Sequence, residues 1–246
     1  KKDKILVKKK VFLFGYFFLS KLRFINFLNK NIQIFIYKLL FKIKVDYFFY
    51  EKIYNFKKFN SNIINSPYTF YSGYWHFKET VLLNKKSIDS ILIKKSIRKR
   101  KISKFIKDKI GKNVVMIHIR GGDYLEKKYQ QHYVCNLDYY KKGILKIEKK
   151  IKNPEYHIFT NDILYAKEIV RNLRLKKTFY VNDLRLKNVE EFSLQTCYRT
   201  ALINNSNFSY LPSLLSKKRQ LTISPKYLFK NILYPKQLVL DNFYLI

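Results

Sequence analysis

The sequence predicts an α/β protein whose C-terminal part is a parallel β-sheet covered by helices. Apolar runs with the composition of buried strands occur at 114–119, 156–160, 178–181, 201–204 and 221–224. Helical apolar spacing occurs at 138–151, 163–173, 189–200 and 209–217. Strands that alternate with helices are typical of a parallel sheet with crossover connections, and we therefore expect residues 111–246 to form a Rossmann-like domain.

Residues 1–110 are expected to form a separate, mostly helical domain. Apolar residues at helical spacing occur in 32–44 and 86–109, whereas 65–77 is rich in turn formers and aromatics and predicts an irregular segment. The apolar run 11–19 is much shorter than the about 20 residues that span a bilayer, and we interpret it as a buried core segment. Because the chain begins with Lys1, we expect this domain to be incomplete.

The composition excludes a disordered chain but leaves the basic charge to be explained. Hydrophobic residues make up 47% of the 246 residues, and 51 Lys and Arg against 17 Asp and Glu give a net charge of +34. Such a charge favours nucleic acid or an anionic membrane. Lys is spread along the whole chain, however, and no nucleic-acid-binding motif occurs, and we therefore predict no nucleic-acid partner. The two cysteines, Cys135 and Cys197, predict reduced thiols in a cytoplasmic protein.

The first strand of the predicted sheet leads into the strongest candidate site. Ligands of open parallel sheets bind beyond the carboxyl ends of the strands, which is where His118, Arg120 and Asp123 lie. The guanidinium of Arg120 is suited to a diphosphate, Asp123 is expected to orient Arg120, and His118 to donate to phosphate or ribose. The alternative interpretation is a core histidine followed by an ordinary glycine turn.

Two later strands also end in polar residues. Asp162 either caps the helix that follows it or binds the guanine or ribose of a nucleotide, and its position favours neither alternative. The segment 204–209 (Asn-Asn-Ser-Asn-Phe-Ser) precedes a helix. Asn205, Ser206 and Ser209 there predict a phosphate site, because a helix N-terminus offers N–H groups and a favourable dipole. The competing hypothesis is a plain helix cap.

These segments resemble a known family. The sequence His-Ile-Arg-Gly-Gly-Asp-Tyr at 118–124 is similar to the His-x-Arg-Arg-x-Asp motif of the α-1,2-fucosyltransferases. Residues 159–163 resemble that family's Ser-Asp-Asp segment, and 203–210 its Asn-Ser-Ser-Phe-Ser-Trp element. A Gly-Tyr-Trp stretch of bacterial members resembles 72–77, so that four elements occur in the family's order.

The resemblance implies a GT-B-like architecture, with GDP-fucose as the donor substrate held by residues 111–246. It also implies an inverting, metal-independent transfer, and the sequence contains no Asp-x-Asp motif that would hold a metal on a diphosphate. We therefore expect no cofactor. Three features depart from the family: Gly121 replaces the second Arg of the motif, residues 210–214 replace a Trp-rich continuation, and an N-terminal Gly-Asn-Gln segment is absent.

The expected reaction is attack of an acceptor hydroxyl on C1 of fucose while Arg120 and the helix N-terminus at Ser206 stabilise the departing GDP. Asp123 and Glu126 are the nearest carboxylates for a general base, and the sequence does not decide between them. The acceptor is expected to be a glycan. Because the chain is strongly basic, we expect it to associate peripherally with the inner face of the cytoplasmic membrane, where the acceptor would be lipid-linked. Two alternatives remain open: a glycosyltransferase of this fold that uses another nucleotide sugar, and a basic nucleic-acid-binding protein.

Overall fold

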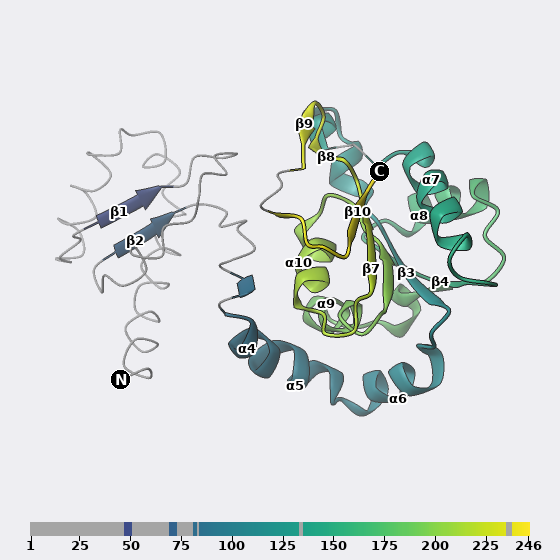
Figure 1. Cartoon of the computed structure of the whole chain (residues 1–246), viewed down its shortest axis with the longest axis horizontal. Helices are drawn as coiled ribbons and strands as arrows, with labels where there is room; N and C mark the ends of the chain where they lie inside the picture. Colours follow the sequence, from purple (N-terminus) through teal and green to yellow (C-terminus); the bar gives the residue numbers. More distant parts are fainter. Residues whose placement is uncertain (1–46, 51–68, 73–80, 83, 133–134, 235–237) are drawn as a thin grey trace. The chain divides into compact units, whose positions relative to one another are not determined.

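The computed structural model describes residues 47–50, 69–72, 81–82, 84–132, 135–234 and 238–246 (Figure 1). The chain divides into two compact units, residues 1–75 and residues 76–246. The segment 86–109 therefore belongs to the same unit as the sheet. We predicted a boundary at 110/111 between an acceptor-side domain and a donor domain. That division of function stays a prediction.

In the first unit the described residues form two parallel strands. β1 (Tyr47–Tyr50) pairs with β2 (Thr69–Ser72) in a register that joins Tyr47 to Thr69. β2 falls inside the segment 65–77 that we expected to be irregular, and this part of that prediction is wrong. β1 consists of aromatic residues alone and β2 contains two aromatics and a Thr, and all of these favour extended backbone. The helix expected at 32–44 and the apolar run 11–19 lie outside the described residues.

The second unit contains a six-stranded parallel sheet, and this confirms the predicted α/β class. Its strands are β3 (Val114–Ile119), β4 (Glu155–Thr160), β5 (Thr178–Tyr180), β6 (Thr200–Leu202), β7 (Leu221–Ser224) and β10 (Phe243–Leu245). They lie in the order β10-β7-β6-β3-β4-β5, and every neighbouring pair is parallel. From β3 the chain winds outward to β5, returns to β6, and then winds outward in the other direction. This is the doubly wound order of a Rossmann-like fold, with its switch point between β3 and β6.

Helices cover both faces of this sheet (Figure 1). They are α7 (Leu137–Glu148), α8 (Ile163–Asn172), α9 (Asn188–Gln195) and α10 (Asn207–Leu215). Val115, Ile117 and Ile119 of β3 join one core cluster with buried residues of α7 and α8. Because successive strand residues point to opposite faces, Met116 and His118 of β3 point toward the other layer.

The helical segment before the sheet is interrupted. The structure has α4 (Lys85–Ile88), a π-helical stretch η3 (Asp89–Ile93), α5 (Lys94–Ile97) and α6 (Arg100–Lys109). The extended backbone of Lys99, with φ −59° and ψ 133°, separates α5 from α6. The expected helix over 86–109 is therefore confirmed in type but divided at this residue.

Several connections at the carboxyl edge of the sheet contain short elements of their own. They are the 3₁₀ helices η4 (Gly122–Leu125), η5 (Lys127–His132) and η6 (Val181–Leu184), and a hairpin of β8 (Tyr227–Phe229) and β9 (Ile232–Leu233). The sequence patterns predicted none of these, nor β10. The helix expected at 189–200 was too long, because the chain turns after Gln195 and enters β6 at Thr200.

Close packing of α7 on β6 generates a prediction. A Cβ atom added at Gly143 would lie 2.5 Å from Cδ1 of the fully buried Leu202. Gly→Ala inside a helix normally stabilises by roughly 0.5–1 kcal/mol. We expect Gly143→Ala instead to destabilise, because overpacking a core costs about 1–3 kcal/mol. Urea unfolding measures the difference. Lys142→Ala on the exposed face is the control, and Leu202→Val, which lacks the clashing atoms, should make Gly143→Ala harmless. A more stable Gly143→Ala protein would contradict this packing.

Candidate active site

The predicted site residues gather at the carboxyl edge of the sheet, around the switch point. His118 is the second-last residue of β3. Ser209 is in the first turn of α10, which follows β6. Nδ1 of His118 lies 2.8 Å from Oγ of Ser209, and this hydrogen bond joins the two connections that diverge from the switch point. The structure therefore brings together two residues that are 91 positions apart.

His118 is a buried, neutral imidazole. Its side chain is 2% exposed, and burial together with the neighbouring Arg120 lowers its pKa from 6.5 to about 3. Asn204 is hydrogen-bonded to it and opposes this shift. With Nδ1 on Ser209, the imidazole joins the end of β3 to the start of α10, which agrees with the alternative interpretation of a satisfied core histidine.

Arg120 follows directly after β3, two residues beyond His118. Its Nη2 is 2.9 Å from both carboxylate oxygens of Asp123 and donates to Oδ2. Its guanidinium also packs over the ring of Tyr124, with 5.3 Å from Cζ to the ring centroid. The Asp123 pairing is the orienting contact that the sequence predicted. Within the described residues, Nε of Arg120 is buried and has no hydrogen-bond partner.

The two glycines after Arg120 allow the loop to lie against the end of β4. The N–H of Gly121 donates to Oδ1 of Asn161 at 3.0 Å, and the N–H of Gly122 donates to Oδ2 of Asp162 at 3.1 Å. Gly122 has a positive φ of 56°. At Gly121 a Cβ atom would lie 2.8 Å from Tyr165 and 2.9 Å from Cβ of Asp162. The place of the family's second Arg is therefore filled by neighbouring atoms.

Asp162 uses both of its carboxylate oxygens on backbone N–H groups. Oδ1 accepts from Tyr165 as the N-cap of α8, and Oδ2 accepts from Gly122. These contacts favour the capping alternative and give the side chain a second task, since it also fixes the Arg120 loop. Binding of guanine or ribose by Asp162 stays a prediction.

The polar segment after β6 is also turned inward. Ser206 caps α10 by accepting from the N–H of Phe208 at 3.2 Å, and its own N–H donates to Oδ1 of Asn204 at 3.0 Å. Nδ2 of Asn205 donates to the carbonyls of His132 and Leu228, and this ties η5 to the hairpin. These bonds favour a cap and a clamp over open N–H donors. Phosphate binding here stays a prediction.

An aromatic cluster beside Arg120 was not found from the sequence. The ring of His132 contacts Tyr124, Tyr129 and Phe229, with centroid distances of 5.3, 6.1 and 4.8 Å. The pKa of His132 is lowered by burial, and the nearby Asp123 opposes part of this shift. The contact with Phe229 depends on the hairpin, and no local spacing signals it. Asn161 was also missed, although it directly precedes the predicted Asp162.

The two candidate bases are both paired with cations. Asp123 is paired with Arg120, and Oε2 of the exposed Glu126 lies 2.8 Å from Nζ of Lys128. In the described ranges no three His, Cys, Asp or Glu side chains are grouped to hold a metal ion. The expectation that the reaction needs no metal or cofactor stays a prediction. No helix in the described part of the chain is long and apolar enough to cross a membrane.

A parallel sheet with this strand order, and a polar cluster at its switch point, defines a protein of the Rossmann-like α/β class. The model of glycosyl transferase family 11 matches residues 9–237. The chain therefore belongs to glycosyl transferase family 11, the α-1,2-fucosyltransferase family whose motifs it resembles. No curated protein matches the chain.

The packed position of Gly121 predicts that adding the family's second Arg does not improve the site. We expect Gly121→Arg to lose about 1–3 kcal/mol of stability, because any side chain must displace Tyr165 or Asp162. Thermal unfolding and calorimetric titration with GDP measure the two effects. Asn172→Arg, at the exposed end of α8, is the control with equal added charge. Tighter GDP binding by Gly121→Arg with unchanged stability would contradict the packing.

The pKa of His118 predicts a pH dependence of stability. An unfolded His118 titrates near 6.5 and the folded one near 3, and the unfolded state therefore binds more protons between these values. The contribution of neutral His118 to the free energy of unfolding is fully present above about pH 6.5. It decreases as the pH falls toward 3, by up to about 1.4 kcal/mol per pH unit. Urea unfolding across this range should show a shallower slope for His118→Asn. Equal slopes for parent and variant would show that His118 is not held neutral.

Proposed function

We propose that this chain transfers L-fucose from GDP-fucose to a glycan hydroxyl, the 2-hydroxyl of a galactoside. The observation that carries the proposal is the Nε of Arg120 just beyond β3, which is buried and has no hydrogen-bond partner among the described residues. A buried donor without a partner costs about 1–3 kcal/mol, and a diphosphate oxygen would remove that cost. Membership of glycosyl transferase family 11 supports the choice of reaction.

In the proposed reaction the acceptor oxygen forms a bond to C1 of fucose on the face opposite the diphosphate. The bond between C1 and the diphosphate oxygen breaks, GDP leaves with the electron pair, and the acceptor proton passes to a base. Arg120 stabilises the negative charge that develops on the leaving diphosphate. Asp123 holds the guanidinium in place through its 2.9 Å contact.

Asp123 is proposed to act mainly by positioning Arg120. Both of its carboxylate oxygens lie 2.9 Å from Nη2 of Arg120, where they fix the direction of the guanidinium. If Asp123 instead took the acceptor proton, it would have to leave Arg120 during the reaction. Loss of Asp123 is therefore expected to weaken donor binding as well as turnover.

The acceptor is proposed to be part of a membrane-bound glycan, with the enzyme on the inner face of the cytoplasmic membrane. The net charge of +34 supports this location, since each Lys near an anionic leaflet contributes about 1 kcal/mol to attachment. Sedimentation with anionic and neutral vesicles at low and high salt tests it. Equal binding to neutral vesicles would count against an electrostatic attachment.

The role of Arg120 is tested by substitution. We expect Arg120→Ala to lower the rate of transfer from GDP-fucose by about 10²- to 10³-fold, as removal of a charge-stabilising donor does in other enzymes. Arg120→Lys should recover only part of this loss, because Lys lacks the planar donor fork. The control is Arg171→Ala on the exposed surface of α8. Near-normal transfer by Arg120→Ala would remove Arg120 from the mechanism.

The identity of the donor is tested by ligand-dependent stability. A ligand that binds only the native state raises its melting temperature. GDP-fucose is expected to raise it, whereas GDP-mannose and UDP-sugars are expected to have smaller effects. A larger shift with one of those would favour the alternative of another nucleotide sugar. Product analysis with GDP-fucose and a panel of β-galactosides then identifies the acceptor and linkage.

A further inference from the structure

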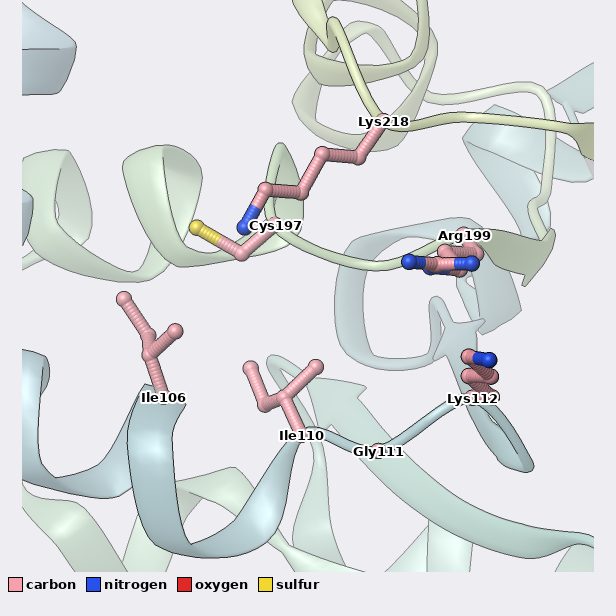
Figure 2. Close-up of a pocket in the computed structure, with 7 residues that line it drawn as sticks. All are labelled: Ile106, Ile110, Gly111, Lys112, Cys197, Arg199 and Lys218. Atoms are coloured by element: carbon pink, nitrogen blue, oxygen red, sulfur yellow. The ribbon is translucent and has the colours of Figure 1, made fainter.

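A polar hollow lies at the amino edge of the sheet, opposite the edge that holds the predicted site residues. It has a volume of about 180 Å³ and is lined by residues of α6 and of the connections that enter β3, β6 and β7 (Figure 2). Three of its lining residues are cationic, Lys112, Arg199 and Lys218, and others are Ile106, Ile110 and Cys197. None of the predicted site residues lines it. Along β3, roughly 20 Å separate the two edges, since a strand rises about 3.3 Å per residue.

The charge of this hollow is not balanced. Its lining contains no carboxylate, and within the described residues Lys112, Arg199 and Lys218 form no ion pair. Burial raises the pKa of the Cys197 thiol, which therefore contributes no negative charge. Figure 2 shows the ends of Arg199 and Lys112 one above the other, with the Lys218 ammonium reaching toward Cys197. Lys112 and Arg199 thus lie on one side of the hollow and Lys218 on the side of Cys197, with no carboxylate in the lining.

Helix dipoles explain only part of this arrangement. α6, α9 and α10 end just before Lys112, Arg199 and Lys218, and a helix C-terminus carries the equivalent of about half a negative charge. Three helix ends therefore offset about half of three full positive charges. The remainder favours a bound anion.

We propose that this hollow binds a phosphate group. Its volume is below the roughly 300–1,000 Å³ of sites for larger small molecules, which favours a compact anion over a nucleotide sugar. Arg199 offers a planar donor fork and the two Lys offer point charges, and such charge-assisted bonds suit phosphate oxygens. Ile106 and Ile110 form an apolar wall beside these cations, of which Lys112 and Lys218 are exposed. The phosphate belongs either to a free anion or to a lipid headgroup.

The test uses the whole chain and a triple variant, Lys112→Gln, Arg199→Gln and Lys218→Gln. The matched control is Lys141→Gln, Lys149→Gln and Arg171→Gln, which removes the same charges from α7 and α8. Lys149 caps α7, and Arg171 is in the last turn of α8, so that the control also removes cations from helix ends. Should the triple variant fail to fold, the double variant Lys112→Gln and Lys218→Gln replaces it.

Two measurements distinguish the sources of phosphate. The first is calorimetric titration with inorganic phosphate at constant ionic strength. The second is flotation with vesicles that contain phosphatidic acid, compared with vesicles of equal charge that contain phosphatidylglycerol. Parent and control should bind phosphate alike, and the triple variant should bind at least about tenfold more weakly, because it lacks all three charged donors.

Each outcome decides the proposal. Loss of phosphate binding in the triple variant alone, with equal flotation of all three proteins, supports a site for a free anion. If the triple variant alone loses the preference for phosphatidic acid vesicles over phosphatidylglycerol vesicles, the phosphate belongs to a lipid headgroup. If parent, control and triple variant behave alike in both measurements, or if the triple variant only melts earlier in phosphate-free buffer, the cations serve the helix ends and the proposal is wrong. Because sugar transfer enters neither measurement, these results are independent of the proposed function.

Discussion

The reversal of strand order between β3 and β6 is the constraint on which the carboxyl-edge site depends. The connections that follow these adjacent strands diverge, and the predicted site residues lie where the two connections begin. The hydrogen bond between His118 and Ser209 ties the end of β3 to the start of α10. A charged imidazole at this depth would be costly, and its low pKa keeps it neutral at physiological pH. Arg120, two residues further along, is held there by Asp123 and Tyr124.

The arrangement of the sheet could be predicted from the sequence because strands buried on both faces are continuous apolar runs. β3 and β7 have the predicted bounds, and β3 is buried along its whole length. β10 has only three residues at the chain end, which is too short for a pattern. The strand order also required the structure, because residues within a strand do not encode which strand lies next to it.

The site was predictable in position but not in side-chain direction. The rule for parallel sheets placed Asp162 and Asn205 correctly at the carboxyl edge. Their hydrogen bonds, however, are made to Gly122 and to the carbonyls of His132 and Leu228, which are distant in sequence. Polar residues at the end of a strand satisfy backbone groups before they are available to a ligand. The same side chains can therefore suggest a binding site in the sequence and act as supports in the structure.

Gly121 shows how such supports affect the charge and position of the loop that carries Arg120. A second Arg at this position would add a cation, but it would also separate the loop from Asn161 and Asp162, which hold it through Gly121 and Gly122. With glycine, the backbone approaches these side chains closely and the loop gains two hydrogen bonds. The fixed loop limits where the remaining cation can lie, and Asp123 limits it further. An Arg in a constrained position loses less conformational entropy when an anion binds than a mobile one does, and the constraints on Arg120 therefore act against the effect of the missing charge.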